Sequence, residues 1–198
     1  MTRFSPILLL AVTFVWIGCG SGPSGETPID VDTDTLSVEP TEPETETKVA
    51  EVNLVATSGS ELSGTVTFTE EDGMVTMVAE ISGLTKGVHA IHIHEFGDCS
   101  TEDGSSAGGH WNPTGDPHGK WGDADGYHRG DIGNIEADEN GVGTITMTTD
   151  EWCVDCGDAD KDVVGHSIII HDLPDDFVTQ PTGNAGIRLA CGVIELHN

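Results

Sequence analysis

Short runs in which hydrophobic and polar residues alternate follow one another along most of the chain after residue 50. The clearest run spans 62–69, where Leu62, Val66 and Phe68 fall on one face and threonines on the other. Runs of this kind, each 5 to 10 residues long, predict strands at 52–57, 62–69, 75–81, 88–94, 132–137, 142–149, 167–171 and 187–196. With turn sequences between them and no helical period, they predict an all-β domain, an eight-stranded antiparallel β-sandwich or flattened barrel.

The run at 88–94 carries histidines at alternate positions. Side chains alternate between the faces of a strand, so His92 and His94 share a face with Ala90, while Ile91 and Ile93 lie on the opposite, apolar face. Two adjacent imidazoles on a rigid strand can bind zinc or copper. The alternative is a pair of solvent-exposed histidines.

A glycine-rich segment of nearly forty residues follows this strand and contains further metal-ligand side chains. His110, His118, His128 and Asp131 form a complete donor set for a closed tetrahedral zinc site. The alternative is a polar surface loop in which histidines occur by chance. Because a long loop without regular structure needs something to hold it, we favour a metal site in a loop that folds back over the histidine strand.

Two positions near the C-terminus could contribute to the same chemistry. His171 ends a predicted strand and could be a further ligand or merely exposed. Arg188 lies in a loop-and-strand segment of an acidic chain, where it could pair with a carboxylate or attract a small anion.

The charge of the chain excludes several classes of partner. With a formal net charge of −28 and seven Lys and Arg, the chain lacks the basic footprint that nucleic-acid binding requires. Acidic membrane surfaces are excluded as targets of the folded domain for the same reason.

The first fifty residues differ in composition from the rest. An apolar run from Pro6 to Gly18 predicts a signal peptide over 1–18, and the following Cys19 resembles the lipidated cysteine of bacterial lipoproteins, with plain secretion as the alternative. Residues 19–50, rich in acids, Ser, Thr and Pro, predict a disordered tether with a reach of about 30 Å. The folded domain is expected over 51–198, exported to the periplasm, outer membrane or cell surface.

Taken together, six motifs in this order resemble those of the copper–zinc superoxide dismutases. The resemblance covers roughly residues 51–197 and rests on H-I-H-E-F-G-D-C, S-A-G-G-H-W-N-P, H-G-K, H-R-G-D-I-G-N, V-G-H-S-I-I-I-H and T-G-N-A-G-I-R-L-A-C-G-V-I. It implies a Greek-key barrel with long metal-binding loops, one copper and one zinc per chain, and superoxide as the substrate. Monomers and homodimers are both compatible with it.

Carried over position by position, the resemblance implies two sets of metal ligands. The copper ligands would be His92, His94, His110 and His171, and the zinc ligands His110, His118, His128 and Asp131. His110 would then bridge the two ions as an imidazolate. In the family's reaction, copper oxidises one superoxide to dioxygen, the bridge at His110 breaks and takes up a proton, and copper then reduces a second superoxide to hydrogen peroxide.

The resemblance also implies roles for residues around the metals. Arg188 would guide the anionic substrate, and Asp175 would link a copper ligand to a zinc ligand. Cys99 and Cys191 would form a disulfide that holds the metal loop to the last strand. Independently of the resemblance, Lys120 could add its charge to the local attraction at Arg188.

Two features depart from the family pattern. The loop after His171 is short and acidic where relatives display basic residues, which puts long-range attraction of superoxide in doubt. Cys153 and Cys156 lie outside the pattern, and a local disulfide, an added metal site and an intermolecular role remain open. The competing functions are a copper-binding or copper-storage module without turnover and a purely structural β-sandwich.

Overall fold

The computed structural model describes residues 46–197, so the predicted signal peptide, Cys19 and nearly all of the predicted tether lie outside the described residues. The strands are β1 Lys48–Ala56, β2 Ser63–Glu71, β3 Met74–Ser82, β4 Gly87–His94, β5 Gly133–Ala137, β6 Val142–Thr149, β7 Ser167–His171, β8 Arg188–Val193 and β9 Glu195–Leu196. Within the described part, the only helical element is a 3-10 turn, Ser105–Ala107. No helix in that range is long and apolar enough to cross a membrane.

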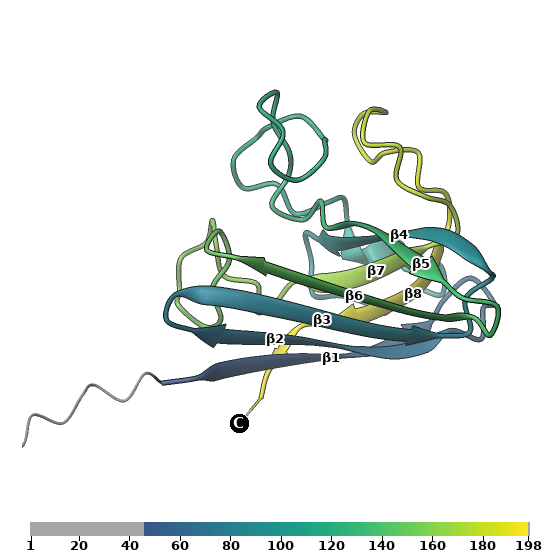
Figure 1. Cartoon of the computed structure of the whole chain (residues 1–198), viewed down its shortest axis with the longest axis horizontal. Coiled ribbons are helices and arrows are strands. Elements are labelled where there is room, and N and C mark those ends of the chain that lie inside the picture. Colours follow the sequence, from purple (N-terminus) through teal and green to yellow (C-terminus); the bar gives the residue numbers. More distant parts are fainter. Residues whose placement is uncertain (1–45, 198) are drawn as a thin grey trace, which may run out of the picture. The chain divides into compact units, whose positions relative to one another are not determined.

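The strands close into an antiparallel barrel, which confirms the predicted fold class (Figure 1). The order around the sheet is β2, β3, β6, β5, β4, β7, β8, β1, and β1 also pairs with β2. The consecutive strands β4, β5 and β6 are neighbours, and β7 returns to lie beside β4, which is a Greek-key connection.

Alternation along the strands places one face of each in the barrel interior. Leu62, Val66 and Phe68 are buried as predicted, and so are the alternate residues of β3 from Val75 to Ile81. The large buried side chains at the centre include Phe68, Met77, Ile91, Ile93, Ile135, Ile168 and Ile170.

Several strand boundaries differ from the prediction by one to four residues, and two of the differences have a clear cause in the pairing. β1 begins at Lys48, three residues before the predicted start of the domain at 51, because Lys48 to Ala50 continue the pairing with β2. The predicted strand 187–196 divides into β8 and β9 at Ile194, whose N–H donates to the carbonyl of His166 instead of to β1.

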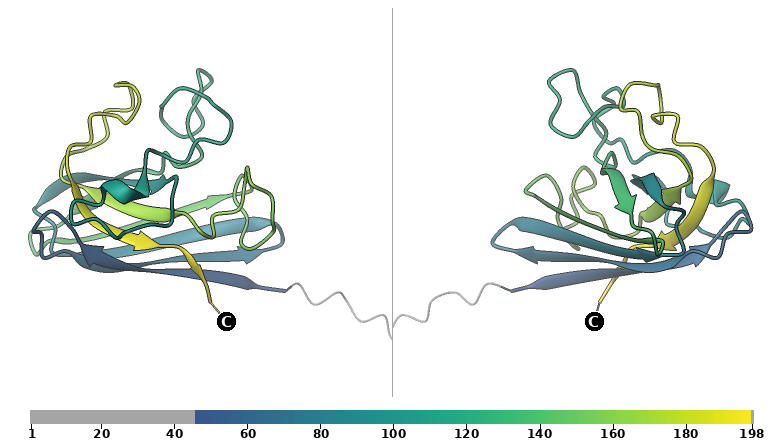
Figure 2. Two further views of the ribbon diagram at one scale, coloured as in Figure 1. Left: turned by 180° about the vertical axis from the view of Figure 1, so that it is seen from behind. Right: turned by 45° about the vertical axis from the view of Figure 1, so that its right-hand side comes forward.

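Two long connections rise from the same side of the barrel (Figures 1 and 2). One joins β4 to β5 and the other joins β7 to β8. All predicted metal-ligand residues belong to these connections or to the ends of β4 and β7 that meet them.

Candidate metal centre

The two histidines of β4 lie in the part of the strand that pairs with β7. β4 pairs with β5 from Gly87 to Ile91 and with β7 from Ile91 to His94, so His92 lies opposite Ile169 and His94 opposite Ser167. Both imidazoles are buried, and His171 stands at the end of β7 on the same side. The sheet therefore fixes three imidazoles before any loop residue is added.

The loop after β4 returns to the end of this strand. His110 forms an isolated β-bridge with His94, the N–H of Trp111 donates to the carbonyl of Ile93, and the N–H of Ile93 donates to the carbonyl of Gly130. A Cβ atom at Gly130 would overlap the Ile93 carbonyl, so this crossing requires glycine. The predicted fold-back of the loop over the histidine strand is present.

Four imidazoles converge on one point. One nitrogen from each of His92, His94, His110 and His171 lies within 4.8 Å of those of the others. The nitrogens without a hydrogen-bond partner are Nδ1 of His92, Nε2 of His94, Nε2 of His110 and both nitrogens of His171. Four buried lone-pair donors face one another with nothing of the protein between them.

A second group lies beside the first and contains a carboxylate. Asp131 Oδ1 is 2.8 Å from Nδ1 of His110, 3.0 Å from Nδ1 of His118 and 3.2 Å from Nδ1 of His128. The approaches of His118 and His128 are not those of hydrogen bonds, because both nitrogens remain without a hydrogen-bond partner. Separations of about 3 to 3.5 Å are those expected of four atoms bound tetrahedrally to one zinc ion.

His110 is the one residue common to both groups. Its Nδ1 faces Asp131, and its Nε2 belongs to the group that contains His92, whose ring centre is 3.9 Å away. A single imidazole therefore separates the two sites.

The protonation of the four-imidazole group suits metal binding, whereas zinc must displace a proton from His118, because burial of that ring is outweighed by the carboxylates of Asp131 and Asp175, which raise its pKa to about 9. Burial lowers the pKa of His110 to about 4 and that of His171 to about 2, and it also lowers the pKa of His92 and His94, so all four rings are neutral at pH 7. Burial opposes ionisation of Asp131, but hydrogen bonds from the surrounding histidines outweigh it and hold the carboxyl pKa well below its usual range. Metal ligands must be neutral imidazoles and ionised carboxylates.

Asp175 connects the two groups through the ring nitrogens of His92 and His118 that face away from them. The Nε2–H groups of His92 and His118 donate to its two oxygens at 2.9 Å each. These bonds leave Nδ1 of both rings as the lone-pair nitrogen, which is the orienting role that metal-bound histidines usually require.

Asn134 and Gln180 support this arrangement and were not identified from the sequence. Asn134 on β5 accepts from the N–H of Asp175 and donates to its carbonyl. Gln180 bonds to both the N–H and the carbonyl of His118. Their only signal in the sequence is an amide side chain in a loop-rich region, which is too common to be diagnostic.

His89 belongs to the same strand but to neither group. Its ring is buried, with Nδ1 2.9 Å from the carbonyl of His171 and Nε2 2.8 Å from the carbonyl of Thr85. Of the six histidines between 87 and 131, five therefore face the metal groups, and this one ties β4 to the end of β7.

Arg188 is half-buried at the start of β8 and bonds to the metal loop. Its guanidinium donates to the carbonyls of Gly104 and Gly108 at 2.6 Å each. Its charge acts on the nearby rings of His94 and His171, where it lowers the pKa as a lesser cause after burial. The cation thus lies beside the four-imidazole group. Lys120 is exposed and follows Gly119, whose N–H donates to Asp131.

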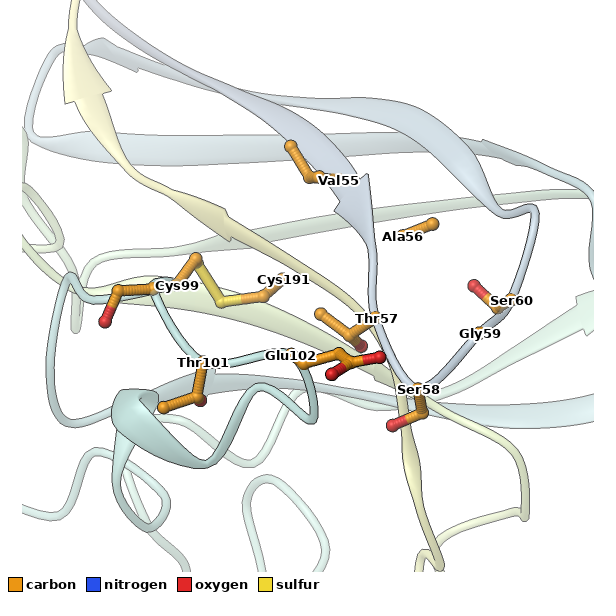
Figure 3. A pocket seen from close by; sticks show the side chains of 11 residues that line it. Val55, Ala56, Thr57, Ser58, Gly59, Ser60, Cys99, Thr101, Glu102 and Cys191 are labelled. Carbon is orange, nitrogen blue, oxygen red and sulfur yellow. A yellow bond between two sulfur atoms is a disulfide. The ribbon is translucent and has the colours of Figure 1, made fainter.

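Both pairs of cysteines after residue 50 are joined. Cys99 in the loop is bonded to Cys191 on β8, and Figure 3 shows this bond beside Thr101 and Glu102. A cavity of about 430 Å³ adjoins this disulfide, between the β1–β2 turn and the loop. None of the residues of the two metal groups lines it. Cys153 is bonded to Cys156 in the connection between β6 and β7.

The comparison with known families agrees with the barrel and the two histidine groups. The model of the copper/zinc superoxide dismutase (SODC) family matches residues 62–194. The chain belongs to this family, whose members are oxidoreductases that dismutate superoxide and contain copper and zinc.

Proposed function

We propose that His92, His94, His110 and His171 hold copper, that His110, His118, His128 and Asp131 hold zinc, and that the copper site turns over superoxide. The observation that carries this proposal is the set of seven buried imidazole nitrogens without a hydrogen-bond partner, all belonging to these two groups. Buried polar atoms are normally paired, because an unpaired one costs roughly 1–3 kcal/mol. Two metal ions would satisfy six of them, since His171 can offer one of its two nitrogens to copper.

The donor sets support this assignment of the two ions. Four imidazoles suit copper, whereas three imidazoles and one carboxylate close a tetrahedral zinc site. Copper, when bound, supplies the one-electron couple with which one superoxide is oxidised and another reduced.

The residues around the four imidazoles supply binding and proton handling. Arg188 offers a positive charge for the anion while its bonds to Gly104 and Gly108 keep the guanidinium in place. Nε2 of His110 is the ring atom at which a proton can be held, since Nδ1 faces Asp131. Asp175 keeps His92 and His118 in fixed tautomers.

Superoxide consumption by Arg188 variants of the metal-loaded protein tests turnover and substrate binding. Arg188→Ala should lower kcat/KM by about 10- to 100-fold, the loss expected for removing one charged contact. Arg188→Lys should restore part of the rate because it keeps the charge. Metal-loaded wild-type protein that does not consume superoxide would instead favour a copper-storage module.

Metal analysis of a second variant tests the ligand assignment. His128→Ala removes a donor from the zinc set alone, so zinc content should fall while copper content is retained. His171→Ala is the matched variant for the copper set. Loss of the same metal from both variants would contradict the division into two sites.

Export, lipidation of Cys19 and a tether from residue 19 to the start of β1 at Lys48 form a further part of the proposal. The apolar run before Cys19 and the two disulfides of the folded domain support export. Mass spectrometry of the mature N-terminus tests it, since a lipid-modified Cys19 and an unmodified N-terminus differ by hundreds of daltons.

A further inference from the structure

The connection between β6 and β7 contains a group of metal-ligand atoms that the dismutase site does not use. Cys153 is buried, Cys156 is exposed, and their Cα atoms are 6.0 Å apart. Each Sγ and a carboxylate oxygen of Asp162 lie within 4.8 Å of one another. Figure 1 shows this connection, drawn in green, extending beyond the end of β6.

The backbone holds these three residues together without help from the sulfur–sulfur bond. Cys153 and Asp162 form a parallel β-bridge, in which the N–H of Cys153 donates to the carbonyl of Lys161 and the N–H of Val163 donates to the carbonyl of Cys153. The side chain of Lys48 donates to the carbonyl of Asp155 and so ties the loop to β1. None of these bonds involves a sulfur atom, so they do not depend on the disulfide.

The carboxylate of Asp162 is oriented by its own loop. Oδ1 accepts from the N–H groups of Asp155 and Val164, and Oδ2 accepts from the N–H of Gly157. Because each carboxylate oxygen has about two acceptor positions, Oδ2 retains one that is free for a cation. Hydrogen bonds of this kind to a ligating carboxylate are the usual support of a metal site.

The two disulfides of the chain differ in how firmly they are held. Cys99 and Cys191 are 92 residues apart and Cys191 is fully buried, whereas Cys153 and Cys156 are three residues apart and Cys156 is exposed. Closing a longer loop contributes more stability, and exposed sulfur is more accessible to an attacking thiolate. A dithiol should therefore reduce Cys153–Cys156 first.

We infer that reduction of this disulfide creates a third metal site, in which Cys153, Cys156 and Asp162 bind Zn²⁺. A dithiol transfers two electrons to the disulfide and becomes a disulfide itself, leaving two protein thiols. Zn²⁺ then displaces one proton from each thiol and binds two thiolates and one carboxylate. The fourth position is open to water.

The chemistry of the loop favours this ion. Zinc accepts both thiolate and carboxylate ligands, and the donor types here match that preference. Asp155, Asp158 and Asp160 are exposed in the same connection, and their negative charges raise the local concentration of cations. In its oxidised form the pair is a disulfide and offers no thiolate, so binding is gated by redox state.

The experiment starts from protein loaded with copper and zinc. After mild reduction with a dithiol, thiol counting should give two free thiols per chain, with Cys99–Cys191 still intact. Zinc titration should then add one equivalent per chain, and Co²⁺ in its place should give the thiolate-to-cobalt charge-transfer absorption. The dismutase site cannot produce this signal, since it contains no cysteine.

Variants connect the signal to the three residues. Cys156→Ser, at an exposed position, should abolish the added equivalent and the charge-transfer band. Asp162→Asn should weaken zinc binding by about 10- to 100-fold. Asp160→Asn is the matched control: it removes a carboxylate from the same loop without touching the group, and its zinc affinity should stay within about threefold of wild type.

Three outcomes would overturn the inference. They are the absence of an added equivalent in the reduced wild-type protein, an added equivalent that persists in Cys156→Ser, and equal losses of affinity in Asp160→Asn and Asp162→Asn. Equal losses would show that both carboxylates attract zinc through their charge and that Asp162 does not bind it. None of these outcomes bears on the dismutase site, so the two proposals can fail separately.

Discussion

At the residue scale, Gly183 leaves the space in which His118 and Asp175 form their hydrogen bond. Its backbone has φ +64°, a conformation that residues with a side chain rarely adopt. A Cβ atom there would overlap both Asp175 Oδ1 and His118 Nε2. The hydrogen bond between those two atoms therefore depends on the missing side chain.

Gly183→Ala should displace Asp175 and so increase the rate of zinc loss to a chelator, together with a fall in unfolding free energy of about 1–3 kcal/mol. Gly73→Ala is the control, because Gly73 has φ +75° with no atom within 4 Å of an added Cβ. It shares the backbone strain but not the overlap. Equal zinc-loss rates in the two variants would contradict the role assigned to Gly183.

The histidine pKa values predict that the metal-free protein is most stable near pH 6.5. Below that pH, the unfolded chain binds protons that folded His110 and His171 do not, because burial lowers their pKa to about 4 and about 2. The unfolding free energy should therefore fall as the pH falls. Above pH 6.5, folded His118 retains a proton that the unfolded chain has lost. Burial acts against this proton, but the adjacent carboxylates of Asp131 and Asp175 raise the pKa of His118 to about 9. The unfolding free energy should fall again toward pH 9.

Urea unfolding of metal-free protein between pH 4.5 and 9 measures the fall of the unfolding free energy on both sides of pH 6.5. Zinc-loaded protein is the comparison, since Nδ1 of His118 would then hold the ion and the fall above pH 6.5 should disappear. Stability of the metal-free form that rises steadily from pH 6.5 to 9 would contradict the proton on His118.

At the element scale, the two disulfides close chain segments of very different length. The chain-entropy relation gives about 4–5 kcal/mol for the bond across 92 residues and about 2 kcal/mol for the bond across three. Replacing Cys99 and Cys191 together by Ser should therefore lower the unfolding free energy more than replacing Cys153 and Cys156. Urea unfolding of the two double variants compares them, and the reverse order would show that the chain-entropy relation does not govern this fold.

The sequence predicted elements better than it predicted the contacts between them. Alternation identified β2 and β3 because each buries one face, whereas β7 is buried on both faces, and the two histidines of β4 followed from the same period of two. The start of β1 was missed because Lys48 and Val49 continue a composition typical of the tether. Asn134 and Gln180 were missed because their roles depend on β5 and on the β7–β8 loop meeting Asp175 and His118, which no local pattern records.

At the scale of the whole molecule, the net negative charge determines how fast superoxide can approach the site. Residues 51–198 contain 27 Asp and Glu but five Lys and Arg. The long-range field therefore repels superoxide, and Arg188 attracts it only at short distance. Salt screens the long-range field more than it screens the contact at Arg188.

The rate of superoxide consumption should accordingly rise as ionic strength increases from about 10 to 150 mM, over which the Debye length falls from about 30 to 8 Å. Stopped-flow measurement of kcat/KM at constant pH gives this dependence. A rate that falls with added salt would mean that attraction at the site extends beyond the acidic background.

Closure of the barrel also has a consequence for self-association. Since β1 pairs with both β2 and β8, the sheet formed by residues 46–197 closes on itself, but β5 and β6 share a single residue pair, Ala137 with Gly143, so the rest of β6 has a strand partner on one side alone. A strand from another molecule would find unpaired backbone along that side of β6, so self-association of the intact fold should begin there. Detachment of β1 would in addition expose the flanks of β2 and β8.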